Sequence, residues 1–183
     1  MTDITIFGTG NMGAAIAGVL AAGGADIHHV NTSSGGGIQG DIVILATPYA
    51  ALRDIVDRYG ADLAGKIVVD ITNPIDFQTF QMTVPADSSA AAQLASWLPA
   101  SHVVKAFNTN FAQALVPSNA GTVVLIAGDD EGAKKTLADA VTAGGLSAID
   151  AGPLSTAREL EAVAYLQIKL AMAGKASGIA VIP

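Results

Sequence analysis

The stretch DITIFGTGNMG, residues 3–13, predicts a strand, a glycine-rich turn and the start of a helix. Its first half, Asp3–Phe7, is largely apolar and β-branched, which is typical of a buried strand. Its second half spaces Gly8, Gly10 and Gly13 as Gly-x-Gly-x-x-Gly, and a helical pattern over Asn11–Ala22 follows. A glycine loop between a strand and a helix is the phosphate-binding turn of dinucleotide-binding domains.

Each glycine of this loop has a distinct expected role. Gly8 permits the tight turn, Gly10 lets the backbone approach a pyrophosphate, and Gly13 lets the helix pack against the strand. The helix N-terminus adds N–H donors and the positive end of the helix dipole. An ordinary strand-to-helix turn is the alternative, but the strand, the spacing and the helix all match. We therefore predict that the cofactor is bound by Gly8, Thr9, Gly10, Asn11, Met12 and Gly13.

Short apolar strands alternate with helical patterns along the rest of the chain. The predicted strands are 25–30, 41–46, 66–71, 102–107, 122–127 and 147–151, and the predicted helices are 50–59, 88–98, 131–143 and 155–172. This alternation predicts an α/β fold of Rossmann type, with a doubly wound, mainly parallel sheet. We expect a single domain, in which residues 152–183 form a small C-terminal helical segment packed on an NAD(P)-binding part at residues 1–151.

The connection after the second strand is short, because only residues 31–40 lie between the predicted strands 25–30 and 41–46. A crossover helix plus an extra strand does not fit, so we expect a sheet shortened in the half that normally holds adenosine. An NAD enzyme usually has an acid here for the ribose 2′-hydroxyl, whereas this chain has Asn31, Thr32 and Ser33. These side chains can donate to a 2′-phosphate, although a plain polar turn is the alternative. We predict that they contact the cofactor, and that NADP is preferred over NAD.

Other predicted strand ends carry polar groups or proline. Ligands bind at the C-terminal ends of strands in open α/β sheets, so further cofactor contacts are expected at Ala46, Thr47, Pro48, Tyr49, Thr72, Asn73 and Pro74. Two alternatives stay open, namely a packing role for Tyr49 and a loop-stabilising role for Asn73.

The end of the predicted strand 102–107 supplies the candidate catalytic residues, Lys105 and Asn108. An amine and amides in succession can hydrogen-bond a planar heterocycle. A plain surface charge is the alternative for Lys105.

Composition narrows the function classes. The chain of 183 residues has a formal net charge of −7 and no cluster of Lys and Arg, so nucleic-acid and anionic-membrane partners are not expected. No apolar run has the length of a bilayer span. The lack of cysteine excludes disulfides and thiolate sites and fits the cytoplasm. The three histidines show no metal-ligand spacing, so we expect no metal.

Five segments, taken in chain order, carry a family resemblance. They are IFGTGNMG at 6–13, ATPY at 46–49, DITNP at 70–74, KAFN at 105–108, and DAGPL at 150–154, which leads to ARELE at 157–161. Together they resemble the NADP-dependent oxidoreductases that act on the deazaflavin coenzyme F420, and related dinucleotide-binding reductases. The resemblance implies a Rossmann domain with a small C-terminal helical part, often dimeric. It also implies hydride exchange between NADPH and a deazaflavin laid over the nicotinamide.

Two features depart from this family, and both concern the adenosine half. The family has Ser-Arg at the tip of the second strand to hold the 2′-phosphate, where this chain has Thr32 and Ser33. It also has the helix for which residues 31–40 leave no room.

The leading hypothesis is hydride transfer between NADP(H) and a flavin or deazaflavin, since transfer between two bound rings needs positioning more than acid–base groups. The glycine loop also resembles that of pyrroline-5-carboxylate reductases, so an imine reductase is a second hypothesis. Those enzymes have a large helical substrate domain, for which the residues after Gly152 are too few. A non-catalytic NADP-binding sensor is the third hypothesis.

A homodimer is expected partly through the predicted helix 155–172, because it has a broad apolar face. The alternative is that this face covers the domain's own sheet. The residues of this face are Leu160, Val163, Ala164, Leu166, Gln167, Leu170 and Ala171.

Overall fold

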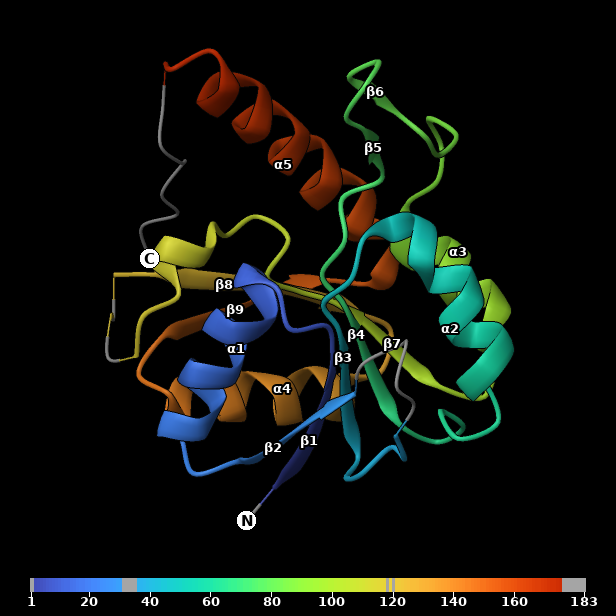
Figure 1. Cartoon of the computed structure of the whole chain (residues 1–183), viewed down its shortest axis with the longest axis vertical. Coiled ribbons are helices and arrows are strands. Elements are labelled where there is room, and N and C mark those ends of the chain that lie inside the picture. The colour runs from blue at the N-terminus through green and yellow to red at the C-terminus, as the bar shows by residue number, and fades with distance from the viewer. Residues whose placement is uncertain (1, 31–35, 118, 120, 176–183) are drawn as a thin grey trace.

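The computed structural model of the chain describes residues 2–30, 36–117, 119 and 121–175. Within these residues, one seven-stranded sheet has the order β2-β1-β3-β4-β7-β8-β9 (Figure 1). Its strands are β1 Asp3–Phe7, β2 Asp26–Val30, β3 Ile42–Leu45, β4 Ile67–Asp70, β7 His102–Lys105, β8 Val123–Gly128 and β9 Ser147–Gly152. The Rossmann-type α/β fold predicted from the sequence is therefore confirmed.

Helices cover both faces of the sheet. They are α1 Asn11–Ala22, α2 Leu52–Tyr59, α3 Ala90–Trp97, α4 Glu131–Ala143 and α5 Ala157–Met172, with the short 3-10 helices η1 Tyr49–Ala51, η2 Ala112–Ala114 and η3 Leu154–Thr156. In Figure 1, α1 and α4 lie on one face and α2 and α3 on the other. The side-chain alternation of β1 serves both layers, because Ile4 and Ile6 join the core under α1 and α4 while Phe7 joins the core under α2 and α3.

The sheet has one antiparallel pair, between β7 and β8, and its other pairs are parallel. After β7 the chain turns at the C-terminal edge of the parallel strands and enters β8 directly, without crossing over. The described residues of this turn, 106–117, 119, 121 and 122, therefore lie at the edge where ligands bind in this fold. The sequence predicted strand positions here but gave no sign of the reversal.

The sheet is short on the side that normally holds adenosine, because β2 is its edge strand there. In a standard dinucleotide fold a further strand lies outside this one. Of the connection from β2 to β3, residues 36–41 are described, and they contain neither a helix nor a strand.

A two-stranded hairpin, β5 Ile75–Asp76 and β6 Gln81–Met82, was not predicted from the sequence. Its strands of two residues are too short for a side-chain alternation to be recognised. The hairpin stands beside α5 at the C-terminal edge of the sheet (Figure 1), and the Tyr165 hydroxyl donates a hydrogen bond to the Phe80 carbonyl at 2.7 Å. Among the described residues, no helix is both long and apolar enough to cross a membrane.

Candidate functional site

Two glycines of the loop between β1 and α1 are required by the packing of the loop itself. Gly8 has a φ of +106°, and a Cβ placed there would lie 2.2 Å from the Ala46 carbonyl oxygen. A Cβ at Gly13 would lie 2.5 Å from the carbonyl oxygen of Gly8. Both positions therefore exclude a side chain whether or not a ligand is bound.

Gly10 is different, because nothing in the described structure requires it to be glycine. It precedes the first residue of α1, its φ and ψ of −72° and −179° are extended, and a Cβ placed there meets no atom within 4 Å. The start of α1 has no side-chain cap, and Thr9, Gly10 and Asn11 are exposed. A cradle without side chains at an uncapped helix N-terminus fits a pyrophosphate. The predicted 2′-phosphate contacts Asn31, Thr32 and Ser33 lie outside the described residues.

The turn after β3 contains the predicted residues Ala46, Thr47, Pro48 and Tyr49. The Ala46 amide donates to the Phe7 carbonyl at 2.8 Å, which holds this turn against the glycine loop. The Thr47 hydroxyl oxygen is buried and has no hydrogen-bond partner among the described residues. Tyr49 lies farther along, and its hydroxyl donates to Gln93 on α3. Burial, followed by the negative charges of Glu161 and Asp70, raises the pKa of Tyr49 above its usual value.

The turns after β4 and β7 are joined by a pair of amide side chains. Asn73 Nδ2 donates to the Asn108 carbonyl at 3.0 Å, and Asn108 Nδ2 donates to Asn73 Oδ1 at 3.0 Å. The loop-stabilising role considered for Asn73 is thus present in the structure. The Thr72 hydroxyl and Asn108 Oδ1 are buried, with no hydrogen-bond partner among the described residues. Pro74 ends this turn, and its carbonyl accepts a hydrogen bond from the Thr83 amide at 2.8 Å.

The backbone at Phe107 is strained. Its φ of +60° lies in the left-handed region, which an aromatic residue rarely adopts, and its side chain is fully buried. The Asn110 amide donates to the Phe107 carbonyl at 3.1 Å and closes the turn. Strain of this kind is characteristic of turns that present functional groups, and here the turn presents Asn108.

Lys105 does not reach the surface, so the expectation that it contacts a ligand needs correction, and its alternative as a surface charge is wrong. Its side chain is 0% exposed, and its ammonium group donates to Asp70, Glu161 and the Thr72 carbonyl. The carboxylates of Asp70, at the end of β4, and Glu161, on α5, balance the positive charge of Lys105. Glu161 ends the resembling segment 157–161, but its pairing with Lys105 was not predicted because the two residues are 56 positions apart in the chain.

A pocket of about 310 Å³ opens where these turns meet α5. Its lining residues are Met12 of α1, Ile71 and Asn73 after β4, Phe107, Asn108 and residues 110–113 after β7, and Gln167 and Ile168 of α5. The walls are apolar or carry side-chain amides, and no lining residue is ionisable. The pocket thus begins beside the glycine loop and extends beneath α5.

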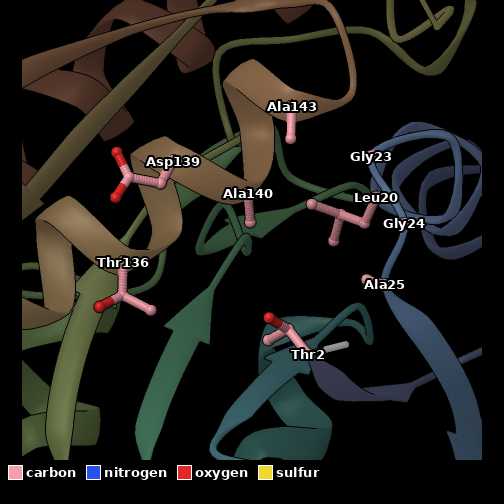
Figure 2. Close-up of a pocket in the computed structure, with 9 residues that line it drawn as sticks. All are labelled: Thr2, Leu20, Gly23, Gly24, Ala25, Thr136, Asp139, Ala140 and Ala143. Atoms are coloured by element: carbon pink, nitrogen blue, oxygen red, sulfur yellow. The ribbon is translucent and has the colours of Figure 1, made fainter.

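A second cavity, of about 400 Å³, lies at the opposite edge of the sheet, between the end of α1 and the second half of α4 (Figure 2). Small and apolar residues form most of its wall, and its carboxylate, Asp139, is bound to Lys135 at 2.6 Å. It is far from the glycine loop and brings together no set of ligand-binding groups. In the described part of the chain, no group of three His, Asp or Glu side chains could hold a metal ion.

The curated proteins that are similar in sequence to the chain include two reductases. The F420-dependent NADP reductase of Methanocaldococcus jannaschii is 35% identical over 148 residues, which are 76% of this chain and 66% of that relative. The metalloreductase STEAP3 of Rattus norvegicus is 39% identical over 124 residues, which are 67% of this chain and 24% of that protein. The chain therefore spans just under two thirds of the first relative and about a quarter of the second. No protein-family model matches it.

Solved structures show the same fold. A candidate F420-dependent NADP reductase from Arthrobacter sp. FB24 superposes with a TM-score of 0.82 at 24% identity, covering 97% of each chain. An imine reductase from Bacillus cereus superposes with a TM-score of 0.68 at 19% identity, covering 95% of this chain and 63% of that one. Sequence identity over three quarters of the chain, together with the shared fold, shows that it belongs to the F420-dependent NADP reductase-like family of dinucleotide-binding oxidoreductases.

Proposed function

We propose that the protein transfers a hydride between NADP(H) and a flavin or deazaflavin ring. Its family, which is one of NADP-dependent oxidoreductases, supports the nicotinamide half of this proposal. When bound, NADPH supplies a hydride, which reduces the acceptor ring while a proton from water completes the balance.

The part of the proposal that concerns the acceptor ring is supported by the residues that line the 310 Å³ pocket. It has apolar walls and the paired amides of Asn73 and Asn108, of which Asn108 Oδ1 has no partner among the described residues, and no lining residue is ionisable. Amides can pair with the alternating donors and acceptors at the edge of a planar heterocycle. Direct transfer between two rings relies on alignment of the reacting atoms at roughly 3–3.5 Å, not on a protein acid or base. Apolar walls also exclude water from the bound rings.

The positions of the site residues suggest which of them would contact NADP(H) and which would contact the acceptor ring. Gly10 and the start of α1 would hold the pyrophosphate, since among the described residues no atom lies within 4 Å of a Cβ placed at Gly10. The turns after β3 and β4 would face the nicotinamide. The hydroxyls of Thr47 and Thr72, which have no partner in the described part of the chain, can bind its carboxamide there. Asn108 and α5 would then contact the acceptor ring.

An imine reductase is the second candidate, because the chain shares its fold with the Bacillus cereus imine reductase. Reduction of a carbon–nitrogen double bond requires a proton at nitrogen as the hydride arrives at carbon. None of the residues that line the pocket can donate that proton at neutral pH. The flavin-type acceptor therefore agrees better with the lining.

The test compares acceptors on one protein sample. NADPH oxidation is followed by nicotinamide absorbance with FMN, 5-deazariboflavin or 1-pyrroline as the acceptor. We expect turnover with at least one of the two isoalloxazine-type rings and none with 1-pyrroline. Turnover with 1-pyrroline alone would favour the imine reductase, and NADPH binding without turnover would favour a sensor.

A further inference from the structure

Three charged side chains are buried together on the elements that also supply the walls of the pocket: Asp70 at the end of β4, Lys105 at the end of β7 and Glu161 on α5. The first two are 0% exposed and Glu161 is 1% exposed. The Lys105 ammonium group lies 2.9 Å from Asp70 Oδ2 and 2.7 Å from Glu161 Oε1. We call these three residues the charge cluster. It ties α5 to two neighbouring strand ends of the parallel sheet.

Glu161 has a second anchor, on α3. Both of its carboxylate oxygens accept from the amide of Ala90, the first residue of α3, at 3.0 Å. A carboxylate at this place also interacts favourably with the positive end of the helix dipole. One side chain of α5 thus binds both a strand end and a helix N-terminus, which fixes α5 against the rest of the fold at that point.

Each member of the charge cluster lies close in the sequence to a wall of the pocket. Asp70 comes just before Ile71 and Asn73, Lys105 just before Phe107 and Asn108, and Glu161 precedes Gln167 and Ile168 on the same helix. The cluster also fixes the turn after β4, because Asp70 Oδ1 accepts from the Thr72 amide at 2.8 Å and Lys105 donates to the Thr72 carbonyl. The glycine loop makes none of these bonds. The cluster therefore holds the walls of the pocket without holding the pyrophosphate turn.

Charges are a costly way to hold a helix. Well-packed apolar side chains of similar volume often stabilise a fold as well as or better than a buried ion pair. Here two carboxylates share one ammonium group, and desolvation raises the pKa of Glu161 even though Lys105 and the Ala90 amide oppose that shift. Such a cluster can fix the position of α5, since hydrogen bonds define the distance and angle between two elements more closely than apolar contacts do.

We propose that Glu161 is a positioning residue for the hydride acceptor: its bonds to Lys105 and Ala90 set where α5, with Gln167 and Ile168, lies over the strand ends. The inference rests on the proposed function, because it takes the pocket beneath α5 as the acceptor site. It assigns α5 a role in placing the second ring, separate from NADPH binding.

The variant Glu161→Gln tests this without leaving an unpaired charge, because Asp70 and Lys105 still balance each other. A glutamine oxygen in place of Oε1 can still accept from Lys105 and Ala90, but the variant loses the Ala90 bond to Oε2 and the negative charge opposite Lys105. Glu159→Gln is the matched control, since it removes the same charge from an exposed position in the first turn of α5. Glu161→Asp, which keeps the charge with a shorter reach, completes the series.

The kinetic arm uses FMN and NADPH with the full chain. We expect Glu161→Gln to raise KM for FMN about tenfold, the equivalent of one lost hydrogen bond of average strength. The Kd for NADPH, measured by calorimetric titration, should stay within about twofold of the wild-type value. The KM of Glu161→Asp for FMN should lie between those of wild type and Glu161→Gln. The KM of Glu159→Gln should equal the wild-type value. Parallel losses in FMN and NADPH binding, or an unchanged KM in a folded Glu161→Gln protein, would overturn the proposal.

The second arm does not depend on turnover. Hydrogen–deuterium exchange of Glu161→Gln should increase in α5 and in the turn after β7, while exchange in β1 and α1 stays at the wild-type rate. Unchanged exchange in α5 would overturn the positioning role by itself. If wild type does not turn over with FMN or 5-deazariboflavin, the proposed function fails, and this exchange pattern then decides whether Glu161 positions α5.

Discussion

One sequence motif contains Gly8, Gly10 and Gly13, but the structure shows that glycine is needed at these positions for different reasons. At Gly8 and Gly13 a Cβ would collide with backbone carbonyl oxygens at 2.2 and 2.5 Å, whereas at Gly10 it would meet nothing within 4 Å. The first two glycines are therefore needed to fold the loop. Only at Gly10 does the explanation require a ligand that approaches the backbone.

This difference gives a prediction at Gly10. Gly10→Val should leave the protein folded, at a cost of about 1 kcal/mol for the changed helix cap, and should abolish NADPH binding because the side chain fills the pyrophosphate cradle. Calorimetric titration with NADPH and a thermal melt measure the two effects. Gly8→Val is the matched comparison and should instead lower the melting temperature sharply. A folded Gly10→Val protein that binds NADPH as wild type does would remove the loop from the site.

The sequence indicated that Lys105 is a residue of the site. The structure instead places it in the buried charge cluster with Asp70 and Glu161. Lys105→Met would leave Asp70 and Glu161 buried close together without a counter-charge. We expect a loss of about 3–5 kcal/mol in the free energy of unfolding, measured by urea denaturation. The comparable change Lys135→Met removes an exposed ion pair and should cost less than about 1 kcal/mol. A Lys105→Met protein of unchanged stability but without activity would point to direct catalysis by Lys105 instead.

At the scale of elements, the sequence predicted best where a pattern is long and local. The predicted bounds of α1 and α4 agree with the structure, since both helices have more than two turns of apolar periodicity and glycines after their ends. The helix expected over 155–172 begins at Ala157, because the 3-10 helix η3 precedes it. The hairpin β5–β6 and the direction of β8 were not predicted. Strand direction depends on how the chain turns between β7 and β8, and the alternation of side chains along a strand does not indicate its direction.

The same limit explains the candidate site. Its local parts, the glycine loop and the Asn73 and Asn108 turns, follow strands and could be found from sequence order. The charge cluster could not, because it joins Asp70, Lys105 and Glu161 from three separate elements. A burial pattern alone does not pair distant charges.

The connection between β2 and β3 sets the expected cofactor preference. No acid is present at Asn31, Thr32 or Ser33 to repel a 2′-phosphate, and neutral donors give roughly 1 kcal/mol each, less than a charged partner. We therefore expect NADP to bind on the order of ten- to a hundredfold more tightly than NAD. Ser33→Arg should increase that ratio by adding a bidentate phosphate partner. Dissociation constants of both cofactors, for both proteins, provide the measurement, and a wild-type preference for NAD would place the ribose elsewhere.

For the whole molecule, α5 has two different faces. Leu160 and Ala164 are buried against the rest of the fold, as is Gln167, so part of the apolar face predicted from the sequence covers this chain's own domain. Val163 and Leu166 lie on the other side of the helix, 40% and 51% exposed. This outer side is the part available to a second copy of the chain.

We therefore predict a homodimer in which Val163 and Leu166 are covered. Light scattering of wild type at micromolar concentration should give the dimer mass, and Leu166→Glu should give the monomer mass, because it would bury a charge in the interface. A circular dichroism spectrum should show that the variant is folded. A monomer mass for wild type would contradict the prediction and leave the exposed leucine unexplained.

In the function that we propose, the hydride passes directly between nicotinamide and a flavin-type ring held at the C-terminal edge of the sheet. The most direct measurement uses NADPH deuterated at both C4 positions and 5-deazariboflavin as acceptor, because carbon C5 of the reduced deazaflavin retains a transferred deuterium in water. We expect mass spectrometry to find one deuterium in the reduced deazaflavin, at C5, together with an equal amount of NADP⁺. Reduced deazaflavin without deuterium, or NADPH that is bound but not oxidised, would contradict it.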